Sequence, residues 1–238
     1  MSETIQYPEY KRIMYPPRPK LSIPPDKIQD YEDKGYVGQL KFNGTRTLVE
    51  IRPGGNISLW TRHREPHKAY ALSQAMKTDL LDLYNHNMDS TKTVVFDGEL
   101  MHSKTKGLKD TLILFDILVC DSNYFIGMPM LQRSLILDDV CGNPNKHETE
   151  TGRKIASQAR IFFLDEKENV KFRYLDRVWL AETFCFNLTD VYKSRIDMEE
   201  IEGLVLKKPM APLDRGFSEN NNGDWLIRCR KEHKNYAF

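Results

Sequence analysis

The spacing of apolar and polar residues predicts both strands and helices in the first half of the chain. Runs of β-branched and aromatic residues predict strands at 36–40, 45–52, 56–62, 93–101 and 111–120. Apolar residues recur at helical intervals over 69–85, and 129–140 has the composition of a second helix. The polar segment 26–34 fits a shorter helix, with Asp26 as its N-cap.

The second half of the chain has a weaker pattern. Residues 143–157 predict a polar loop, and a helix is expected within 180–191. Short strands are expected at 161–163, 171–174, 203–207 and 224–229. Strands and helices alternate irregularly and the inferred strand pairs are mostly antiparallel, so we predict an α+β fold and not a doubly wound sheet. No repeat or linker interrupts the sequence, which favours one domain over 1–238.

Prolines distinguish the first 25 residues from the rest. Pro16, Pro17 and Pro24 fix φ and remove backbone donors, so residues 1–25 are predicted as an extended, irregular lead-in. The three strands that follow are separated by turn-forming stretches, Asn43-Gly44 and residues 53–56, and they predict an antiparallel meander. Lys41 would lie on the first corner of this meander.

The composition is that of an ordinary globular protein without overall basicity. The 35 Lys and Arg residues nearly balance the 34 Asp and Glu residues, so a nucleic-acid site would need local clustering of cations. No apolar run could cross a bilayer and the first residues lack a secretory signal, so we expect a cytoplasmic protein without membrane contact. The termini carry cations that would bind nucleic acid or only be solvated: Lys11, Arg12, Arg18, Lys20, Arg215, Lys231 and Lys234.

Five polar islands lie on or beside predicted strands. They are Lys41-Phe-Asn-Gly-Thr-Arg46, Asp97-Gly-Glu-Leu100, Phe115-Asp-Ile-Leu118, Glu202-Gly-Leu-Val-Leu-Lys207 and Trp225-Leu-Ile-Arg-Cys-Arg-Lys231. Together they supply an amine, carboxylates, an aromatic ring and several cations. A site that binds a nucleoside triphosphate with a metal and attacks its α-phosphate needs this set of groups.

Lys41 is the candidate nucleophile of this set. A lysine must be unprotonated to attack, and burial together with neighbouring cations lowers a lysine's pKa from about 10.4 toward neutrality. Such cations would also clamp phosphate oxygens, and the candidates are Arg46, Arg62 or Arg64, Lys207 and Arg228. Glu99 and Glu202 suit Mg²⁺ or Mn²⁺, which prefer oxygen ligands. Phe115 would stack on the base or serve as a core aromatic.

In this order, the islands resemble the covalent nucleotidyltransferase superfamily, which comprises ATP-dependent DNA ligases, RNA ligases and mRNA capping guanylyltransferases. The family's first motif, Lys-x-Asp-Gly-x-Arg, is matched by Lys41 to Arg46, except that Asn43 replaces the aspartate. The next family arginine is matched by Arg62 after Thr61. The later motifs are matched by Asp97 to Glu99, Phe115-Asp116, Glu202 to Lys207, and Arg228 with Arg230. Five matches in order are a specific signal.

The resemblance implies a ligase-type nucleotidyltransferase fold, with mostly antiparallel sheets flanked by helices. It implies that Lys41 attacks ATP to form a lysine–AMP intermediate, that AMP passes to a polynucleotide 5′-phosphate, and that a 3′-hydroxyl then displaces AMP. Mg²⁺ would neutralise the phosphates throughout. The implied catalytic residues are Lys41, Arg46, Arg228 and Arg230. The implied nucleotide-binding residues are these four with Gln39, Leu40, Arg62, Glu99, Phe115 and Lys207, and Glu99 and Glu202 would hold the metal.

Departures from the family pattern change what the resemblance implies. Asn43 removes a carboxylate beside the nucleophile, and we hypothesise that this makes Lys41 easier to deprotonate. Arg228 and Arg230 stand where the family commonly has lysines, so they would clamp phosphate and not donate protons. Family DNA ligases and capping enzymes continue into an OB-fold, whereas this sequence ends at Phe238, so no OB-fold domain is expected.

Several classes of enzyme stay open at this point. The missing OB-fold and the resemblance of Ile227-Arg-Cys-Arg230 to the Ile-Lys-Cys-Lys pattern of one RNA ligase branch favour an RNA ligase, which is our prediction. Asp97 to Leu100 and Arg46 favour the alternative, a DNA ligase that seals nicks. A capping guanylyltransferase that uses GTP and a catalytically inactive nucleic-acid-binding module are further alternatives. A recruiting protein partner would be compatible with each.

Overall fold

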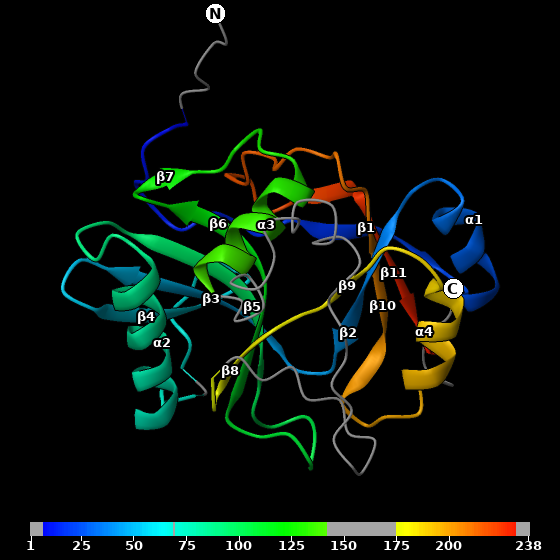
Figure 1. The fold of residues 1–238 in the computed structure, drawn as a ribbon, viewed down its shortest axis with the longest axis horizontal. Helices are drawn as coiled ribbons and strands as arrows, with labels where there is room; N and C mark the ends of the chain where they lie inside the picture. The colour runs from blue at the N-terminus through cyan, green and yellow to red at the C-terminus, as the bar shows by residue number, and fades with distance from the viewer. Residues whose placement is uncertain (1–6, 69, 142–174, 232–238) are drawn as a thin grey trace, which may run out of the picture.

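Two β-sheets make up most of the computed structural model, which describes residues 7–68, 70–141 and 175–231 (Figure 1). Sheet A has the order β4-β3-β5-β6-β7, with β8 paired to β6; its strands are β3 (Thr45–Arg52), β4 (Asn56–Thr61), β5 (Val94–Met101), β6 (Thr111–Cys120), β7 (Asn123–Tyr124) and β8 (Val178–Leu180). Sheet B has the order β1-β11-β10-β2-β9; its strands are β1 (Arg18–Ile23), β2 (Val37–Phe42), β9 (Thr183–Phe184), β10 (Ile201–Lys207) and β11 (Asn222–Arg230). Only β1 with β11 and β6 with β8 are parallel pairs among these strands. The predicted α+β fold class with mostly antiparallel sheets is confirmed.

Helices flank both sheets. They are the 3-10 helix η1 (Pro25–Lys27), α1 (Ile28–Glu32), α2 (Gln74–Asn87), α3 (Met130–Val140) and α4 (Leu188–Arg195). α2 and α3 contribute buried leucines and methionines to the larger hydrophobic core, which lies against sheet A. α1 and α4 contribute Ile28 and Leu188 to a smaller core against sheet B. Figure 1 shows α2 on one side of the molecule, and α1 and α4 on the other.

Sheet A follows the sequence pattern closely. β6 covers the predicted residues 111–120, a nearly continuous apolar run that is mostly buried, as a central strand requires. β3 and β4 form the predicted hairpin. α2 begins at Gln74, later than predicted, because the Ser73 side chain accepts a hydrogen bond from the Met76 N–H and caps the helix there.

The pairing of β2 in sheet B differs from the predicted meander. β2 pairs with β10 and β9 and not with β3, so the Asn43-Gly44 turn connects the two sheets and is not a hairpin turn. Lys41 accordingly lies within β2, opposite Gly203 of β10, and not on a corner. The meander prediction was wrong because the partner of β2 lies far along the sequence, where local turn rules carry no information.

Residues 18–23, within the proline-rich lead-in, form an edge strand whose register with β11 shifts between Pro19 and Leu21. β1 pairs in parallel with β11 at the edge of sheet B, and Pro19 is tolerated there because one side of an edge strand needs no backbone donor. The helix predicted at 26–34 is a 3-10 turn followed by the short α1. Asp26 does not cap it, because the turn already begins after Pro24.

The remaining differences lie in the second half of the chain. The helix expected within 180–191 begins only at Leu188, as α4, and the strands β8 and β9 precede it. β10 and β11 are longer than predicted, since each pairs with two neighbours. The predicted loop 143–157 and the predicted strands 161–163 and 171–174 lie outside the described residues. No helix in the described ranges combines the length and the apolar character needed to span a membrane.

Candidate active site

A pocket of about 780 Å³ lies between the two sheets. Its wall contains every residue for which the sequence predicted a catalytic, nucleotide-binding or metal-binding role: Gln39, Leu40, Lys41, Arg46, Arg62, Glu99, Phe115, Glu202, Lys207, Arg228 and Arg230. These residues belong to β2, β3, β5, β6, β10 and β11, and to the turn after β4. The fold therefore brings together the groups that the motifs scatter along the sequence.

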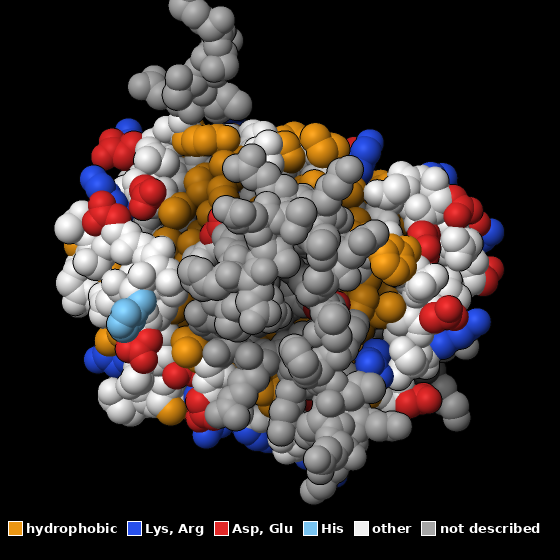
Figure 2. Space-filling view, in the orientation of Figure 1, with side chains coloured by type: hydrophobic (Ala, Val, Ile, Leu, Met, Phe, Trp, Pro, Cys, Tyr) orange, Lys and Arg blue, Asp and Glu red, His pale blue; other side chains and the backbone are white. Residues whose placement is uncertain are grey.

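The pocket concentrates positive charge that the chain as a whole does not have. Nine Lys and Arg residues but only three Asp and Glu residues line the pocket, an excess of six, whereas the net charge of the chain is +1. Figure 2 shows acidic and basic side chains intermingled around the periphery of one face of the molecule. The local clustering of cations that an anion site requires is therefore found in the pocket.

Lys41 and Arg230 face one carboxylate from strands on either side of β10. The Lys41 ammonium forms a short ion pair with Glu202 Oε2, and Arg230 Nε lies 3.6 Å from the same oxygen. Gly203 stands opposite both cations in the strand register. A Cβ on Gly203 would lie 1.9 Å from the Cys229 carbonyl oxygen and its φ is +147°, so the close approach of β10 and β11 requires glycine.

Glu99 of β5 binds the turn that follows the nucleophile. The Gly44 N–H donates to Glu99 Oε1 at 3.1 Å, and the Lys104 ammonium donates to the Gly44 carbonyl oxygen. A Cβ on Gly44 would lie 2.7 Å from Glu99 Cγ, which explains the glycine of the first motif. Burial raises the pKa of Glu99 to about 7, and the positive charge of Lys41 only partly offsets this effect.

Glu99 and Glu202 form a donor set that fits Mg²⁺. The two carboxylates line the same pocket from different sheets, on β5 and β10. Within the described part of the chain, no group of three or more His, Cys, Asp and Glu side chains is placed to hold an ion. Mg²⁺ commonly takes only one or two carboxylates and completes its shell with phosphate oxygens and water. The two glutamates therefore suit a metal ion shared with a nucleotide, and Mn²⁺ prefers the same oxygen ligands.

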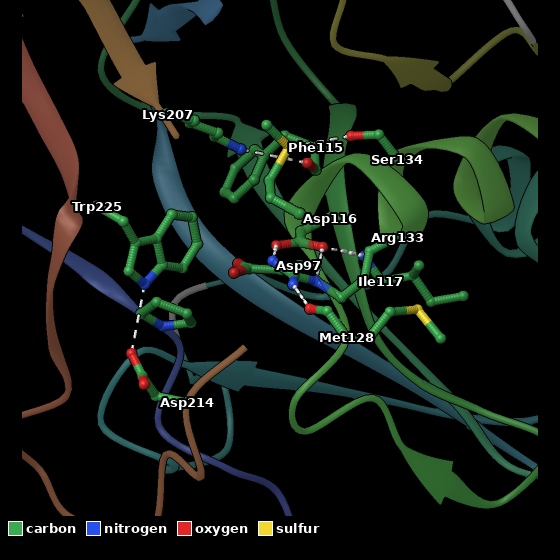
Figure 3. Close-up of polar contacts among 12 residues, drawn as sticks. Asp97, Phe115, Asp116, Ile117, Met128, Arg133, Ser134, Lys207, Asp214 and Trp225 are labelled. Carbon is green, nitrogen blue, oxygen red and sulfur yellow. Dashed lines mark hydrogen bonds and ion pairs between the residues drawn. The ribbon is translucent and has the colours of Figure 1, made fainter. Parts of the chain in front are cut away.

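Phe115 forms an aromatic wall of the pocket, and two cations lie near its ring. The Arg46 guanidinium carbon and the Lys207 ammonium nitrogen are each 5.3 Å from the ring centroid. Figure 3 shows the Lys207 side chain directed toward Phe115, whose carbonyl oxygen is 3.5 Å from the ammonium. Burial lowers the pKa of Lys207 to about 8, although the Asp116 carboxylate opposes this effect. A base stacked on Phe115 would therefore meet positive charge.

Arg46 is held by contacts with the protein itself. Its Nε and Nη2 pair with the Asp97 carboxylate, the first at 2.9 Å, and its Nη1 donates to the Pro17 carbonyl oxygen at 2.7 Å. These bonds fasten the start of β1 to sheet A. Burial raises the pKa of Asp97, and the Arg46 charge only partly offsets this effect. Arg46 thus positions the pocket wall, and the catalytic role expected for it stays a prediction.

Arg133 of α3 binds Asp116, the residue after Phe115, and was not predicted from the sequence. It is fully buried and forms hydrogen bonds of 2.9 and 2.8 Å with the Asp116 carboxylate (Figure 3). A third bond of 2.6 Å reaches the Met128 carbonyl oxygen, and the guanidinium lies 5.8 Å from the Trp225 ring. Burial would raise the pKa of Asp116, but Arg133 outweighs it and lowers that pKa.

Gln39 and Leu40 precede the nucleophile on β2, at the position expected to meet the base. Gln39 is buried, and its side-chain amide donates to Thr183 Oγ1 of β9 at 2.9 Å. Asn43 lies outside the pocket lining in the described chain, and its backbone N–H donates to the Glu200 carbonyl oxygen at 2.8 Å. The hypothesis that the missing carboxylate favours deprotonation of Lys41 is not tested by this geometry.

Arg62 and Arg228 are the remaining predicted phosphate ligands. β4 ends at Thr61, so Arg62 lies in an exposed turn, where its Nε is 3.0 Å from His63 Nε2. Arg64, the alternative to Arg62, is not among the residues that line the pocket, and it has a positive φ of 64°. Arg228 Nε donates to Ser22 Oγ of β1 at 2.6 Å.

Three pocket residues had no individual role in the sequence prediction, and neither had the buried Arg133. They are Lys104, Asp116 and Trp225. The one sequence signal available for Arg133 was an arginine within an apolar helical segment, because such a side chain needs a buried partner. Arg18 and Lys20 were considered only as part of a diffuse basic terminus.

Comparison with known proteins gives matches of structure only. No family model and no curated protein matches the chain. The solved structure Pmar-Lig_PreS3 is 15% identical, with a TM-score of 0.52 over 92% of this chain and 47% of that one. The ATP-dependent DNA ligase from bacteriophage T7, in complex with ATP, is 15% identical, with a TM-score of 0.51 over 92% and 69%. The ligase domain of M. tuberculosis LigD is 13% identical, with a TM-score of 0.50 over 90% and 59%.

These likenesses concern the fold. The chain spans about half of Pmar-Lig_PreS3 and between half and seven tenths of the other two structures. Over about nine tenths of its length, the chain has the fold of the adenylation domain of ATP-dependent DNA ligases.

Proposed function

We propose that this chain is the adenylation domain of an ATP-dependent polynucleotide ligase, which forms a covalent AMP adduct on Lys41. The observation that carries the proposal is the pocket in which Lys41 meets Glu202 and Arg230 under an excess of positive charge. A nucleophilic amine, two carboxylates and phosphate-binding cations in one pocket are the groups that nucleotidyl transfer needs.

The first step is attack of the Lys41 nitrogen on the α-phosphorus of ATP. A nitrogen–phosphorus bond forms, the bond to the β-phosphate oxygen breaks, and pyrophosphate leaves with that electron pair. The amine loses its proton toward Glu202, its hydrogen-bond acceptor. Arg228 and Arg230 bind the phosphates, and Phe115 stacks on the base. Glu99 and Glu202 would hold Mg²⁺, which when bound would neutralise charge on the phosphates.

The later steps transfer AMP from Lys41 to a 5′-phosphate end and seal that end to a 3′-hydroxyl. The solved structures with the same fold include DNA ligases, which supports a nicked DNA duplex as the substrate ahead of the RNA predicted from the sequence. RNA ends are the second candidate, because the Ile227-Arg-Cys-Arg230 pattern favours them. The whole ligase reaction is part of the proposal, since the chain spans only part of the structures that it matches.

Self-adenylation tests the proposal directly. The protein is incubated with Mg²⁺ and ATP or GTP labelled at the α-phosphate, and we expect covalent label from ATP that is lost in Lys41→Ala. Lys208→Ala removes an exposed lysine outside the pocket wall and is expected to keep the label. Absence of label, or label that persists in Lys41→Ala, would refute the proposed AMP adduct on Lys41. Label from GTP in place of ATP would favour a capping guanylyltransferase.

A further inference from the structure

We propose that β1 carries a second phosphate subsite, formed by Arg18 and Lys20, for the backbone phosphates that adjoin the 5′ end of the polynucleotide. This inference rests on the proposed ligase function. It concerns the nucleic-acid substrate and not ATP, and it assigns a role to two cations that the motifs leave unexplained.

Arg18 and Lys20 lie in the wall of the pocket. Arg18 and Lys20 line the same pocket as Lys41, but they come from the edge strand of sheet B. Arg62, from the turn after the edge strand β4 of sheet A, also lines this pocket. The two edges are joined near this point, since His63 Nδ1 lies 3.4 Å from a Glu219 carboxylate oxygen and the Arg18 guanidinium donates to the Glu219 carbonyl at 2.8 Å. Cations from both sheets therefore flank one side of the pocket.

The positive charges of Arg18 and Lys20 are not paired with carboxylates in the described part of the chain. Lys41 and Arg230 share the Glu202 carboxylate, and Arg46 pairs with Asp97, so carboxylates already neutralise part of the inner pocket. Arg18 is bound to a neutral carbonyl oxygen. In the described ranges neither Arg18 nor Lys20 forms an ion pair with a carboxylate. Their charge stays available for an incoming anion.

Arg18 and Lys20 of β1 lie well away from Lys41 of β2. The sheet order places β11 and β10 between β1 and β2, so β1 and the Lys41 strand are three strand spacings apart, about 14 Å. Arg228 and Arg230 of β11 stand between them and are already placed to hold the phosphates of ATP. A phosphate bound by Arg18 and Lys20 therefore belongs to a longer anion. A polynucleotide strand whose 5′ end points at Lys41 has phosphates at such a distance.

The cations of β1 are more accessible to solvent than the inner residues of the pocket. Lys20 and Arg62 are exposed and Arg18 is half-buried, whereas Lys207 and Gln39 deeper in the pocket are buried. The cations of β1 thus lie where a strand would enter from solvent. The other two cations of the lead-in, Lys11 and Arg12, lie in a separate small groove with Tyr124 and Phe217. The structure therefore divides the basic terminus into two groups.

The test compares the double variant Arg18→Gln/Lys20→Gln with the matched double variant Lys11→Gln/Arg12→Gln. Protein that has been adenylated with labelled ATP is mixed with a 5′-phosphorylated nicked duplex, and transfer of AMP is followed at several salt concentrations. We expect the first variant to raise the KM for the duplex about tenfold and to reduce the log–log salt slope by about two, one for each lost phosphate contact. Self-adenylation should stay within about threefold of the wild type, and the control should match the wild type in both steps.

Three outcomes would overturn the subsite. They are unchanged transfer, a higher KM for ATP in self-adenylation, or loss of transfer with an unchanged salt slope, which would indicate altered folding. The charge-preserving variant Arg18→Lys/Lys20→Arg should keep the wild-type slope. If the wild type takes no label, the ligase proposal fails, and anisotropy of a fluorescent 5′-phosphorylated duplex against salt still tests Arg18 and Lys20.

Discussion

The two walls of the pocket are built on different principles. On the sheet A side, Arg133 holds Asp116 through two hydrogen bonds, and the side chains are 0% and 7% exposed. On the sheet B side, Lys41 pairs with Glu202, and each side chain is more than a fifth exposed, at 21% and 23%. Solvent therefore reaches the pair on sheet B more readily than the pair on sheet A.

This difference separates recognition from reaction. An ion pair that solvent reaches contributes about 1 kcal/mol or less, so phosphates and a metal ion can displace it. Breaking a buried pair costs about 3 kcal/mol or more, because one charge is left without a partner. Phe115, which would recognise the base, is followed in β6 by Asp116 of the buried pair, whereas Lys41, which would react, belongs to the exchangeable pair itself.

The largest expected effect comes from Glu202, the single carboxylate that serves both cations on the sheet B side. Glu202→Ala should slow self-adenylation at least about 10³-fold, because it removes a metal ligand together with the partner of Lys41 and Arg230. Single-turnover rates with labelled ATP measure this effect. Asp197→Ala, an exposed carboxylate outside the pocket wall, is the control. A rate within tenfold of the wild type would contradict the role given to Glu202.

The second effect tests whether the sheet A wall is fixed as described. Arg133→Met should lower the free energy of unfolding by about 3 kcal/mol, because the Asp116 charge is left buried without its partner. Urea denaturation monitored by circular dichroism gives this value. The double variant Arg133→Met/Asp116→Asn should recover part of the loss. If the free energy of unfolding of Arg133→Met lies within 1 kcal/mol of the wild-type value, the proposed difference between the two walls is contradicted.

A third test concerns Lys207, which extends from sheet B to Phe115 of sheet A. Its pKa in the folded protein is about 8, below the usual value near 10.5, so the unfolded chain binds more protons between these two pH values. Stability should therefore rise with pH in this window, and this residue should contribute about 2 kcal/mol between pH 7.5 and pH 9.5. Urea titrations of the wild type and of Lys207→Met at both pH values isolate the contribution. Equal pH dependence in the two proteins would exclude it.

The fourth effect is on binding alone. Phe115→Leu should raise the KM for ATP about tenfold while the rate at saturating ATP changes less than about threefold, since base stacking contributes about 1–3 kcal/mol. Phe186→Leu changes an exposed aromatic residue and serves as the control. A fall in rate without a change in KM would assign Phe115 to the reacting wall.

The smallest effect concerns the turn that links the walls. Asn43→Asp adds a carboxylate near the nucleophile, and a negative charge there disfavours the neutral amine. We expect the midpoint of the pH–rate profile for self-adenylation to move upward by at most about one unit. Asn43→Ser, which adds no charge, should leave the midpoint in place. An unchanged or lowered midpoint in Asn43→Asp would end the hypothesis.

Much of sheet A could be predicted because its information is local. β6 was predicted residue for residue, since a buried strand needs a continuous apolar run. The hairpin of β3 and β4 followed from the turn between them. The same turn rules failed at Asn43-Gly44, where the chain passes between sheets, and they placed Lys41 on a corner that does not exist.

The residues that line the site could be predicted from the sequence, but their hydrogen-bond and ion-pair partners could not. Motif order brought Lys41, Glu99 and Glu202 into one proposed site, and all three line the pocket. Neither the bond from Arg46 to the Pro17 carbonyl nor the pairing of Arg133 with Asp116 could be predicted, because each partner is set by packing between distant elements. Sequence patterns identify which chemical groups are present, and tertiary contacts decide which of them are free to react.

The parallel pairing of β1 with β11 has a consequence for synthesis of the protein. Residues 18–23 leave the ribosome early, but their partner strand spans residues 222–230. All strands of sheet A lie within residues 45–180, whereas sheet B cannot close until β11 has been synthesised. Lys41 of β2 is therefore synthesised well before Arg228 and Arg230 of β11, which line the same pocket. The wall of this pocket is complete only when β11 is in place.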